Sequence, residues 1–125
     1  MNTIELSCEL NELYRLNEFL EDILAKEDFQ VKLIAEEVFV NIVNYSHTDL
    51  IKVNANYENS ILTFEFVDEG FEFNPLLKEE IEMPESIEEA KIGGLGIHLT
   101  KEFSDSITYE RKNNENHLII TKKVE

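Results

Sequence analysis

The chain has 125 residues and a single cysteine, which suits one domain with its own hydrophobic core and excludes an internal disulfide framework. Its 11 basic and 27 acidic residues give a formal net charge of −16, which opposes nonspecific binding to nucleic acids and anionic membranes. No apolar run approaches the ~20 residues that cross a bilayer, and the N-terminus lacks an export signal. We therefore expect one cytoplasmic domain over residues 1–125, without a membrane partner or a direct nucleic-acid partner.

The first third of the chain predicts a strand followed by two helices. Residues 3–8 alternate apolar and polar side chains, as a strand does, and apolar side chains then recur at helical spacing over residues 11–26. Asn11 is a candidate N-cap for this first helix, whose outer face is either solvated or binds a partner. A second helix follows Asp28, another good N-cap residue, and runs to about Tyr45.

The rest of the chain contains four strand-like segments and one further helix. The four segments alternate apolar and polar residues and cover residues 50–57, 61–67, 106–111 and 117–123. Polar loops at 58–60 and 112–116 suit hairpins, and residues 95–103 repeat apolar side chains at helical spacing. This order predicts an α+β fold, a two-layer α/β sandwich with a mixed, mainly antiparallel sheet and its helices on one face.

Glycine is confined to the segment between the two pairs of strands. All four glycines fall between positions 70 and 96, where the alternating pattern is broken. Glycine permits positive φ angles and lets another group approach the main chain closely. Because a connection of this length is usually functional, we expect the main chain of this segment to have a role of its own.

Three polar residues form a stripe on the second helix, which is otherwise apolar. Glu37, Asn41 and Asn44 are four and three residues apart, so their side chains lie on one face of the helix. A buried amide without partners costs about 1–3 kcal/mol, and an unpaired carboxylate costs more. A bound ligand would offset this cost. Glu36 lies about 100° away from the stripe, and we interpret it as a flanking charge or a contact to a partner.

Three stretches that are distant in the sequence together suit a nucleotide. Asp68 follows a predicted strand, where its carboxylate can accept a hydrogen bond from an adenine amino group. Residues 93–96 are mostly glycine and open a predicted helix, so their N–H groups can donate to phosphates. The amide oxygen of Asn41 can coordinate Mg²⁺, which takes its other ligands from water and phosphate. These residues predict a site for ATP and Mg²⁺.

The same stretches resemble the motifs of the GHKL superfamily of ATPases and kinases, which includes gyrase, heat-shock chaperones and histidine kinases. Residues 37–41 match its N-box, residues 68–70 followed by 73–75 its G1 region, and residues 91–97 its G2 region. The resemblance spans nearly the whole chain. Within the superfamily the chain looks most like the bacterial anti-sigma-factor serine kinases, whose small domain has the Bergerat-type ATP-binding fold.

The resemblance implies a role for each residue that carries it. It makes Glu37 the catalytic carboxylate, Asn41 the Mg²⁺ ligand and Asp68 the residue that reads adenine. It also implies that Gly70 lets the backbone approach the base. Asn44 either extends the metal site or fixes the helix by a hydrogen bond.

The glycine-rich segment would bind the phosphates. The resemblance implies main-chain contacts from a short run of residues: Gly93, Gly94, Leu95 and Gly96. Lys91 either steadies the phosphates or tethers the ATP lid, which we expect over residues 76–92.

The resemblance also implies a function. Relatives hold a sigma factor inactive and phosphorylate a serine or threonine on a STAS-type antagonist protein, which can then no longer release the sigma factor. The alternative is a nucleotide-gated protein-binding regulator without kinase activity. Relatives often dimerise, so the sequence also leaves a homodimer open.

The chain departs from the family pattern at two places. Many relatives have a second glycine where this chain has Phe71, Glu72 and Phe73, and many have a histidine where this chain has Tyr45. His47 is close to that position but out of register, so we assign it no catalytic role. Three further residues are expected to be packing or exposed residues: Cys8, His98 and His117.

Overall fold

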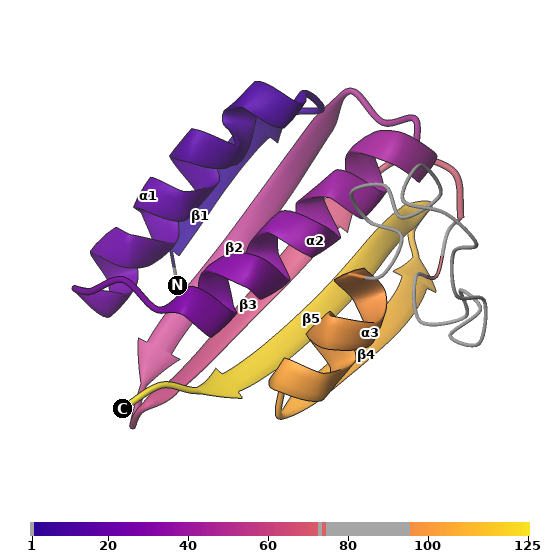
Figure 1. Cartoon of the computed structure of the whole chain (residues 1–125). Helices are drawn as coiled ribbons and strands as arrows, with labels where there is room; N and C mark the ends of the chain where they lie inside the picture. The colour runs from indigo at the N-terminus through magenta and orange to yellow at the C-terminus, as the bar shows by residue number, and fades with distance from the viewer. Residues whose placement is uncertain (1, 73, 75–95) are drawn as a thin grey trace, which may run out of the picture.

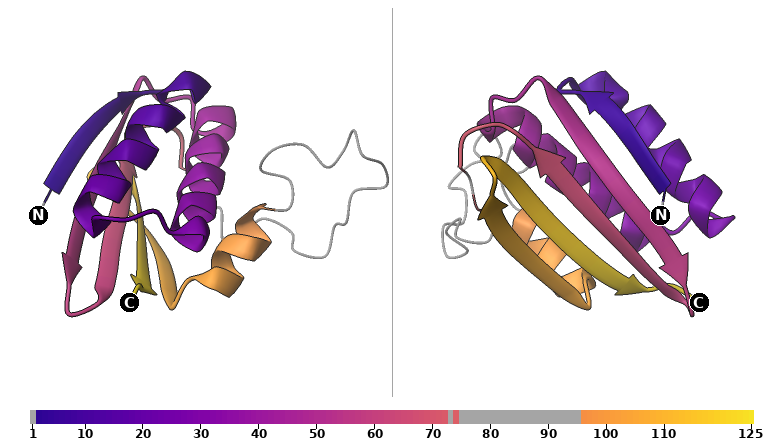
Figure 2. Two further views of the ribbon diagram at one scale, coloured as in Figure 1. Left: turned by 60° about the vertical axis from the view of Figure 1, so that its left-hand side comes forward. Right: turned by 180° about the vertical axis from the view of Figure 1, so that it is seen from behind.

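In the part of the chain that the structure describes, helices cover one face of a five-stranded sheet (Figure 1). The computed structural model describes residues 2–72, 74 and 96–125. Its α-helices are α1 (Leu13–Leu24), α2 (Phe29–Tyr45) and α3 (Gly96–Phe103), and Figure 2 shows the helix layer and the sheet layer from the side. The predicted α+β fold with helices on one face is confirmed. Within the described ranges, no helix is both long enough and apolar enough to cross a membrane.

The strands follow one another across the sheet in the order β1-β2-β3-β5-β4, and each neighbouring pair is antiparallel. Their bounds are β1 Asn2–Ser7, β2 Leu50–Glu58, β3 Ile61–Asp68, β4 Ser106–Lys112 and β5 Glu115–Lys123. β3 and β4 run in the same direction, but β5 lies between them. For this reason the described sheet is antiparallel throughout, which differs in detail from the mixed sheet expected from the sequence.

Both hairpins turn through two residues. The four loop residues all have positive φ angles: Asn59, Ser60, Asn113 and Asn114. Two positive φ angles in a two-residue loop are typical of a type I′ turn, which matches the twist of the paired strands. Both predicted loops are too long: Glu58, in the loop predicted at 58–60, belongs to β2, and the loop predicted at 112–116 overlaps β4 and β5. β5 begins at Glu115, so Asn116 belongs to the sheet.

The starts of the two long helices differ from each other. α2 begins as predicted, because Asp28 Oδ1 accepts a hydrogen bond from Val31 N at 2.9 Å. The prediction that Asn11 caps the first helix is wrong, because Asn11 lies inside a short 3₁₀ helix, η1 (Leu10–Glu12). The residue before α1 is Glu12, whose side chain makes no capping hydrogen bond.

The hydrophobic core lies between the helices and the sheet. Its buried strand residues include Ile51, Val53, Leu62, Phe64, Phe66, Leu118 and Ile120. α2 is largely buried, as the sequence predicted, and Cys8 packs against the edge of the core. Alternate residues of β3 face this core, and the alternation continues to the last residue of the strand. That residue is Asp68, so a carboxylate lies at the end of the core.

Candidate nucleotide-binding site

Asp68 is buried on the helix-covered side of the sheet. It continues the alternation of Phe64 and Phe66 and is only 4% exposed. The strand register pairs it with Ile51 on β2 and with Asn116 on β5. A buried carboxylate needs hydrogen-bond donors to offset its loss of water. The surrounding residues supply these donors.

One carboxylate oxygen of Asp68 receives three hydrogen bonds. Oδ1 accepts from Ser46 Oγ at the end of α2, from Gly70 N at 2.9 Å and from Asn116 Nδ2 at 3.0 Å. An ionised carboxylate is an acceptor at both of its oxygens. In the part of the chain that the structure describes, no donor bonds the other oxygen, Oδ2. Oδ2 is therefore the acceptor that the amino group of a bound base can use.

Gly70 packs against the end of α2 so closely that no side chain fits there. A Cβ atom on Gly70 would lie 2.0 Å from Ser46 Oγ and 2.1 Å from Ser46 O. The next residue makes the same contact, since Phe71 N donates to Ser46 O at 2.8 Å. Glycine is thus required at position 70 by the contact between the end of β3 and α2. The approach of Gly70 to a bound base stays a prediction.

Asn116 is a site residue that the sequence did not indicate, because it was expected in a solvated loop. It is 5% exposed, and its Nδ2 atom donates to Asp68 Oδ1 and, at 2.7 Å, to Phe71 O. The signal that could have found it is the pair Asn113-Asn114, since asparagine tolerates positive φ and favours a two-residue turn. With the turn placed there, Asn116 pairs directly with Asp68.

Two residues of β4 complete the network around Asn116. Its Oδ1 atom accepts hydrogen bonds from the Tyr109 hydroxyl and, at 3.2 Å, from Arg111 Nη1. Arg111 Nη1 also donates to Gly70 O at 2.8 Å. The β4–β5 hairpin is therefore bonded to the segment that follows β3. No motif in the sequence marks Ser46, Tyr109 or Arg111, because their contacts arise only when distant segments meet.

Asn41 lies on the buried side of α2 and is 1% exposed. Its Nδ2 atom donates to Glu37 O at 2.9 Å. Its Oδ1 atom is buried and has no hydrogen-bond partner among the described residues. Such acceptors are rare in proteins and each calls for an explanation. Because an amide oxygen is a ligand that Mg²⁺ accepts, this atom fits a divalent cation bound together with a nucleotide.

The other residues near the stripe on α2 have different surroundings. Glu37 is half-buried one helical turn before Asn41, whereas Asn44 is exposed. Glu36 accepts a hydrogen bond from Asn17 Nδ2 at 3.3 Å, so it links α2 to α1. The interpretation of Glu36 as a flanking charge or a contact to a partner stays a prediction. The roles of Glu37 and Asn44 stay predictions.

The phosphate part of the predicted site is described only where α3 begins. α3 starts at Gly96 and packs against α2, beside which it lies in Figure 1. The other predicted phosphate residues lie outside the described residues: Lys91, Gly93, Gly94 and Leu95. The same holds for the predicted lid over residues 76–92.

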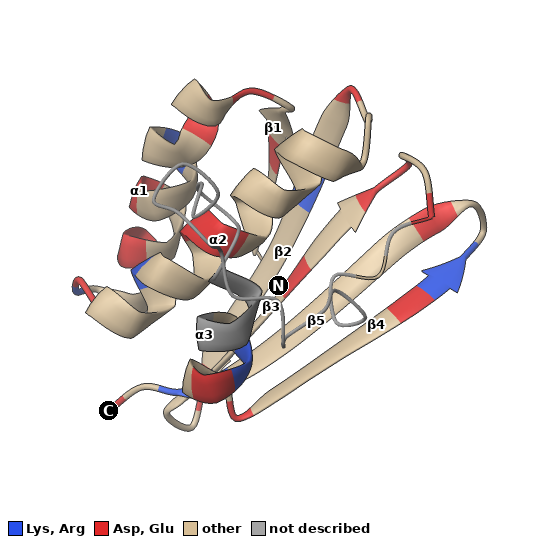
Figure 3. Ribbon diagram, turned by 45° about the vertical axis from the view of Figure 1, so that its right-hand side comes forward, with Lys and Arg blue, Asp and Glu red and all other residues tan. Residues whose placement is uncertain are grey.

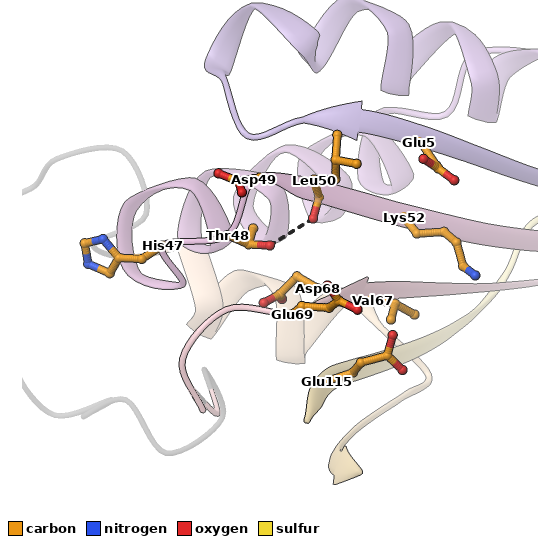
Figure 4. Close-up of a pocket in the computed structure, with 10 residues that line it drawn as sticks. All are labelled: Glu5, His47, Thr48, Asp49, Leu50, Lys52, Val67, Asp68, Glu69 and Glu115. Atoms are coloured by element: carbon orange, nitrogen blue, oxygen red, sulfur yellow. Dashed lines mark hydrogen bonds between the residues drawn. The ribbon is translucent and has the colours of Figure 1, made fainter. Parts of the chain in front are cut away.

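A cavity of about 440 Å³ lies beside this site but opens on the other face of the sheet (Figure 4). Asp68 borders it, yet Glu5 and Lys52 also line it, and both alternate with residues that are buried under the helices. Most charged residues of its wall are acidic, which opposes a polyphosphate. In the described ranges, no cluster of three or more His, Cys, Asp and Glu side chains can hold a metal ion.

The described histidine side chains have packing contacts. The exposed His47 ring lies 5.4 Å from the Phe71 ring, measured between centroids. His117 is buried between Glu65 Oε2 at 3.1 Å and Glu115 Oε1 at 3.3 Å. The burial of His117 agrees with the packing role expected for it, and the side chain of His98 lies outside the described residues.

The fold defines a class of protein, an α+β domain whose helices cover one face of an antiparallel sheet, with a buried carboxylate at the end of β3 and a buried amide oxygen on α2. The family model "Histidine kinase-like ATPase domain" matches residues 7–122. The chain therefore belongs to the histidine kinase-like ATPase domain family, the GHKL superfamily to which its motifs pointed. Membership of a family of ATPases implies that the chain binds ATP.

Particular relatives are similar to the chain in sequence or in fold. The serine/threonine-protein kinase BtrW of Bordetella bronchiseptica is 26% identical over 101 residues, which cover 78% of this chain and 71% of that protein. The catalytic domain of histidine kinase ThkA matches with a TM-score of 0.55 at 19% identity, covering 98% of this chain and 97% of that chain. The Acinetobacter baumannii histidine kinase AdeS matches with a TM-score of 0.58 at 13% identity, covering 99% of this chain and 68% of that chain. At these identities the solved structures show the shared fold alone.

Proposed function

We propose that this chain is an ATP-dependent protein serine/threonine kinase of the anti-sigma-factor type. The observation that carries the proposal is the stripe on α2, where the half-buried Glu37 precedes Asn41 by one helical turn. The buried Oδ1 atom of Asn41 has no hydrogen-bond partner in the described part of the chain. Phosphoryl transfer to a hydroxyl requires a proton acceptor close to the metal-bound phosphates. The similarity to BtrW, which is named a serine/threonine-protein kinase, supports the same class of reaction.

Each described residue of the site has one task in this proposal. Asp68 Oδ2 accepts a hydrogen bond from the adenine amino group, and Asn41 Oδ1 holds Mg²⁺. When bound, Mg²⁺ would offset the negative charge of the phosphates. Glu37 accepts the proton of the attacking serine hydroxyl while the hydroxyl oxygen bonds to the γ-phosphorus and the bond to ADP breaks. The N–H groups where α3 begins, at Gly96, donate to the phosphates.

The proposed partners are a sigma factor, which the chain sequesters, and a STAS-type antagonist, which it phosphorylates. The support for these partners is the resemblance to anti-sigma-factor kinases. The charge of −16 adds to it, because acidic residues are spread over helices and strands (Figure 3) and favour a partner with a basic contact region.

The reaction is tested by transfer of label from γ-labelled ATP to a purified STAS-domain antagonist. Glu37→Gln removes the proton acceptor without changing the shape of the side chain. We expect this variant to lose about 10²–10⁴-fold in transfer rate while its ATP affinity, measured by calorimetry, stays near that of the wild type. Glu36→Gln is the matched control, because it makes the same change on another face of α2 and should leave transfer unchanged.

Two results would count against the kinase. Equal transfer by the wild type and Glu37→Gln would contradict the assignment of Glu37 as the proton acceptor. ATP binding by the wild type without transfer to any antagonist would instead favour a nucleotide-gated protein-binding regulator without kinase activity.

A further inference from the structure

We propose that Arg111 is a positioning residue for the adenine subsite. It holds two of the three groups that bond Asp68, and it thereby fixes the direction of the carboxylate oxygen that is left for the base. This inference rests on the proposed ATP site and adds to it a residue of β4, a strand outside the sequence motifs of that site.

A single guanidinium nitrogen joins the two groups. Arg111 Nη1 donates to Gly70 O at 2.8 Å and to Asn116 Oδ1 at 3.2 Å. Gly70 and Asn116 are in turn donors to Asp68 Oδ1, through Gly70 N at 2.9 Å and Asn116 Nδ2 at 3.0 Å. The third donor to Asp68 is Ser46 Oγ, at the end of α2. Two of the three anchors of Asp68 are therefore bonded to Arg111, and Asn116 Oδ1 is also bonded to the Tyr109 hydroxyl.

The sheet places Arg111 where it can do this. β4 is an edge strand, and its register sets Arg111 directly opposite Asn116. The Arg111 side chain is half-buried. Lys112, the next cation along the strand, is instead exposed, and its Nζ atom lies 3.7 Å from Glu110 Oε2 on the surface. Arg111 and Lys112 are thus neighbouring cations with different surroundings, and Lys112 can serve as a control.

The chemistry of arginine suits this role. A guanidinium group only donates hydrogen bonds, so the Asn116 atom that it contacts must be the amide oxygen. The NH₂ group of Asn116 then faces Asp68 Oδ1 and Phe71 O, both of which are acceptors. Hydrogen bonds from a charged donor are stronger than neutral ones. Loss of Arg111 would leave Gly70 O and Asn116 Oδ1 without this charged donor and would loosen both anchors of Asp68.

This role predicts an effect that depends on the base. The adenine amino group requires Oδ2 of Asp68 in one direction, whereas in the proposed site the phosphates are bound by α2 and the start of α3. Loss of Arg111 should therefore weaken ATP binding without weakening a phosphate chain that has no base. If Arg111 acted only as a positive charge in a chain of net charge −16, all polyphosphates would weaken together.

The test is calorimetric titration of four proteins: wild type, Arg111→Met, Arg111→Lys and Lys112→Met. Each is titrated with ATP, GTP and tripolyphosphate in the presence of Mg²⁺. We expect Arg111→Met to bind ATP about tenfold more weakly and to bind tripolyphosphate as the wild type does. Arg111→Lys keeps a donor and should recover part of the loss, and Lys112→Met should match the wild type. In an Asp68→Asn background, Arg111→Met should add much less than tenfold.

A second measurement needs no nucleotide. The NH₂ protons of Asn116 should exchange with solvent slowly in the wild type and faster in Arg111→Met, or in Arg111→Lys if the methionine variant does not fold. Equal exchange would overturn the inference, as would unchanged ATP affinity or an equal loss for ATP and tripolyphosphate. A wild type that binds no ATP would instead contradict the proposed function. The exchange rates of the Asn116 NH₂ protons would then decide whether Arg111 positions Asn116.

Discussion

Two buried side chains at the site differ in their hydrogen bonds. Asp68 Oδ1 accepts three hydrogen bonds, whereas Asn41 Oδ1 accepts none from the described residues. The first group is thus oriented by residues of the chain itself. The second costs about 1–3 kcal/mol until an electron-pair acceptor reaches it. This contrast supports the proposed roles, in which Asp68 binds the base, whose recognition needs direction, and Asn41 binds the metal ion.

The variant Asn41→Leu separates stability from ligand binding. Leucine has a similar size and no buried acceptor, so we expect the free energy of unfolding in urea to rise by about 1 kcal/mol. The same change removes the proposed Mg²⁺ ligand, so the part of ATP affinity that depends on Mg²⁺ should be lost in calorimetry. A less stable Asn41→Leu protein that keeps this dependence would contradict the assignment.

The pKa of the Cys8 thiol depends in part on the negative charge of Asp68. Burial raises the pKa of Cys8, and the negative charge of Asp68 raises it further. Because the thiolate is the reactive form, alkylation of the native protein should keep accelerating past the pH at which an unstructured cysteine peptide levels off. Since the folded-state pKa is raised, the contribution of this group to stability is present at neutral pH and is lost as the pH rises through that pKa.

Asp68→Asn tests this link. Removing the charge should lower the pKa of Cys8 and shift the alkylation profile toward lower pH, whereas Asp28→Asn, a change at the far end of α2, should not shift it. Identical profiles for the wild type and Asp68→Asn would mean that no charge on Asp68 acts on the thiol.

At the scale of elements, α2 carries most of the proposed chemistry and one side chain fixes its start. Asp28→Ala removes the hydrogen bond from Val31 N and should lower the free energy of unfolding by about 1 kcal/mol, measured in urea. Asn11→Ala is the matched control, because Asn11 lies within η1, and it should change stability by less than about 0.5 kcal/mol. A larger loss for Asn11→Ala than for Asp28→Ala would contradict this account of the helix start.

The order and type of the elements could be predicted because their signals are local. Apolar residues recur at helical spacing in α2 and alternate in β2 and β3, and burial in the structure follows both patterns. The start of β5 could not be predicted in the same way. Polar residues at 113–116 are typical of a loop, and only the type I′ turn decides that the strands continue to Glu115.

The residues of the candidate site differ in the same way, because some have a local signal in the sequence and others do not. The burial of Asn41 could be predicted because a polar residue in an apolar helix is visible in the sequence itself, and the place of Asp68 could be predicted because it follows a clear strand pattern. The partners that hold Asp68 come from the end of α2 and from the β4–β5 hairpin, and they meet it only through sheet register and tertiary contact. Ser46 and Arg111 were therefore missed, and Asn116 was missed because its strand was predicted to start too late.

At the scale of the whole molecule, the excess of acidic side chains gives a net charge of −16, and these side chains repel one another in the folded state (Figure 3). Raising the salt concentration from 0.01 M to 0.1 M shortens the screening length from about 30 Å to about 10 Å. We expect the urea concentration at the midpoint of unfolding to rise over this range, because salt screens the repulsion. A fall in the midpoint would mean that favourable ion pairs outweigh the repulsion.

The assignment of Asp68 as the residue that reads the base is tested most directly by titrating ATP and GTP, with Mg²⁺, into the wild type and Asp68→Asn. In the variant, the amide oxygen takes the three donors now bound to Oδ1, so the NH₂ group replaces Oδ2. The site then offers a donor where adenine also has a donor and guanine has a carbonyl oxygen.

We predict that Asp68→Asn loses at least about tenfold in ATP affinity and gains affinity for GTP. Glu69→Gln, at the exposed neighbour, should change neither. Equal ATP affinity in the wild type and Asp68→Asn, or a wild type that binds no ATP at millimolar concentrations, would contradict the assignment.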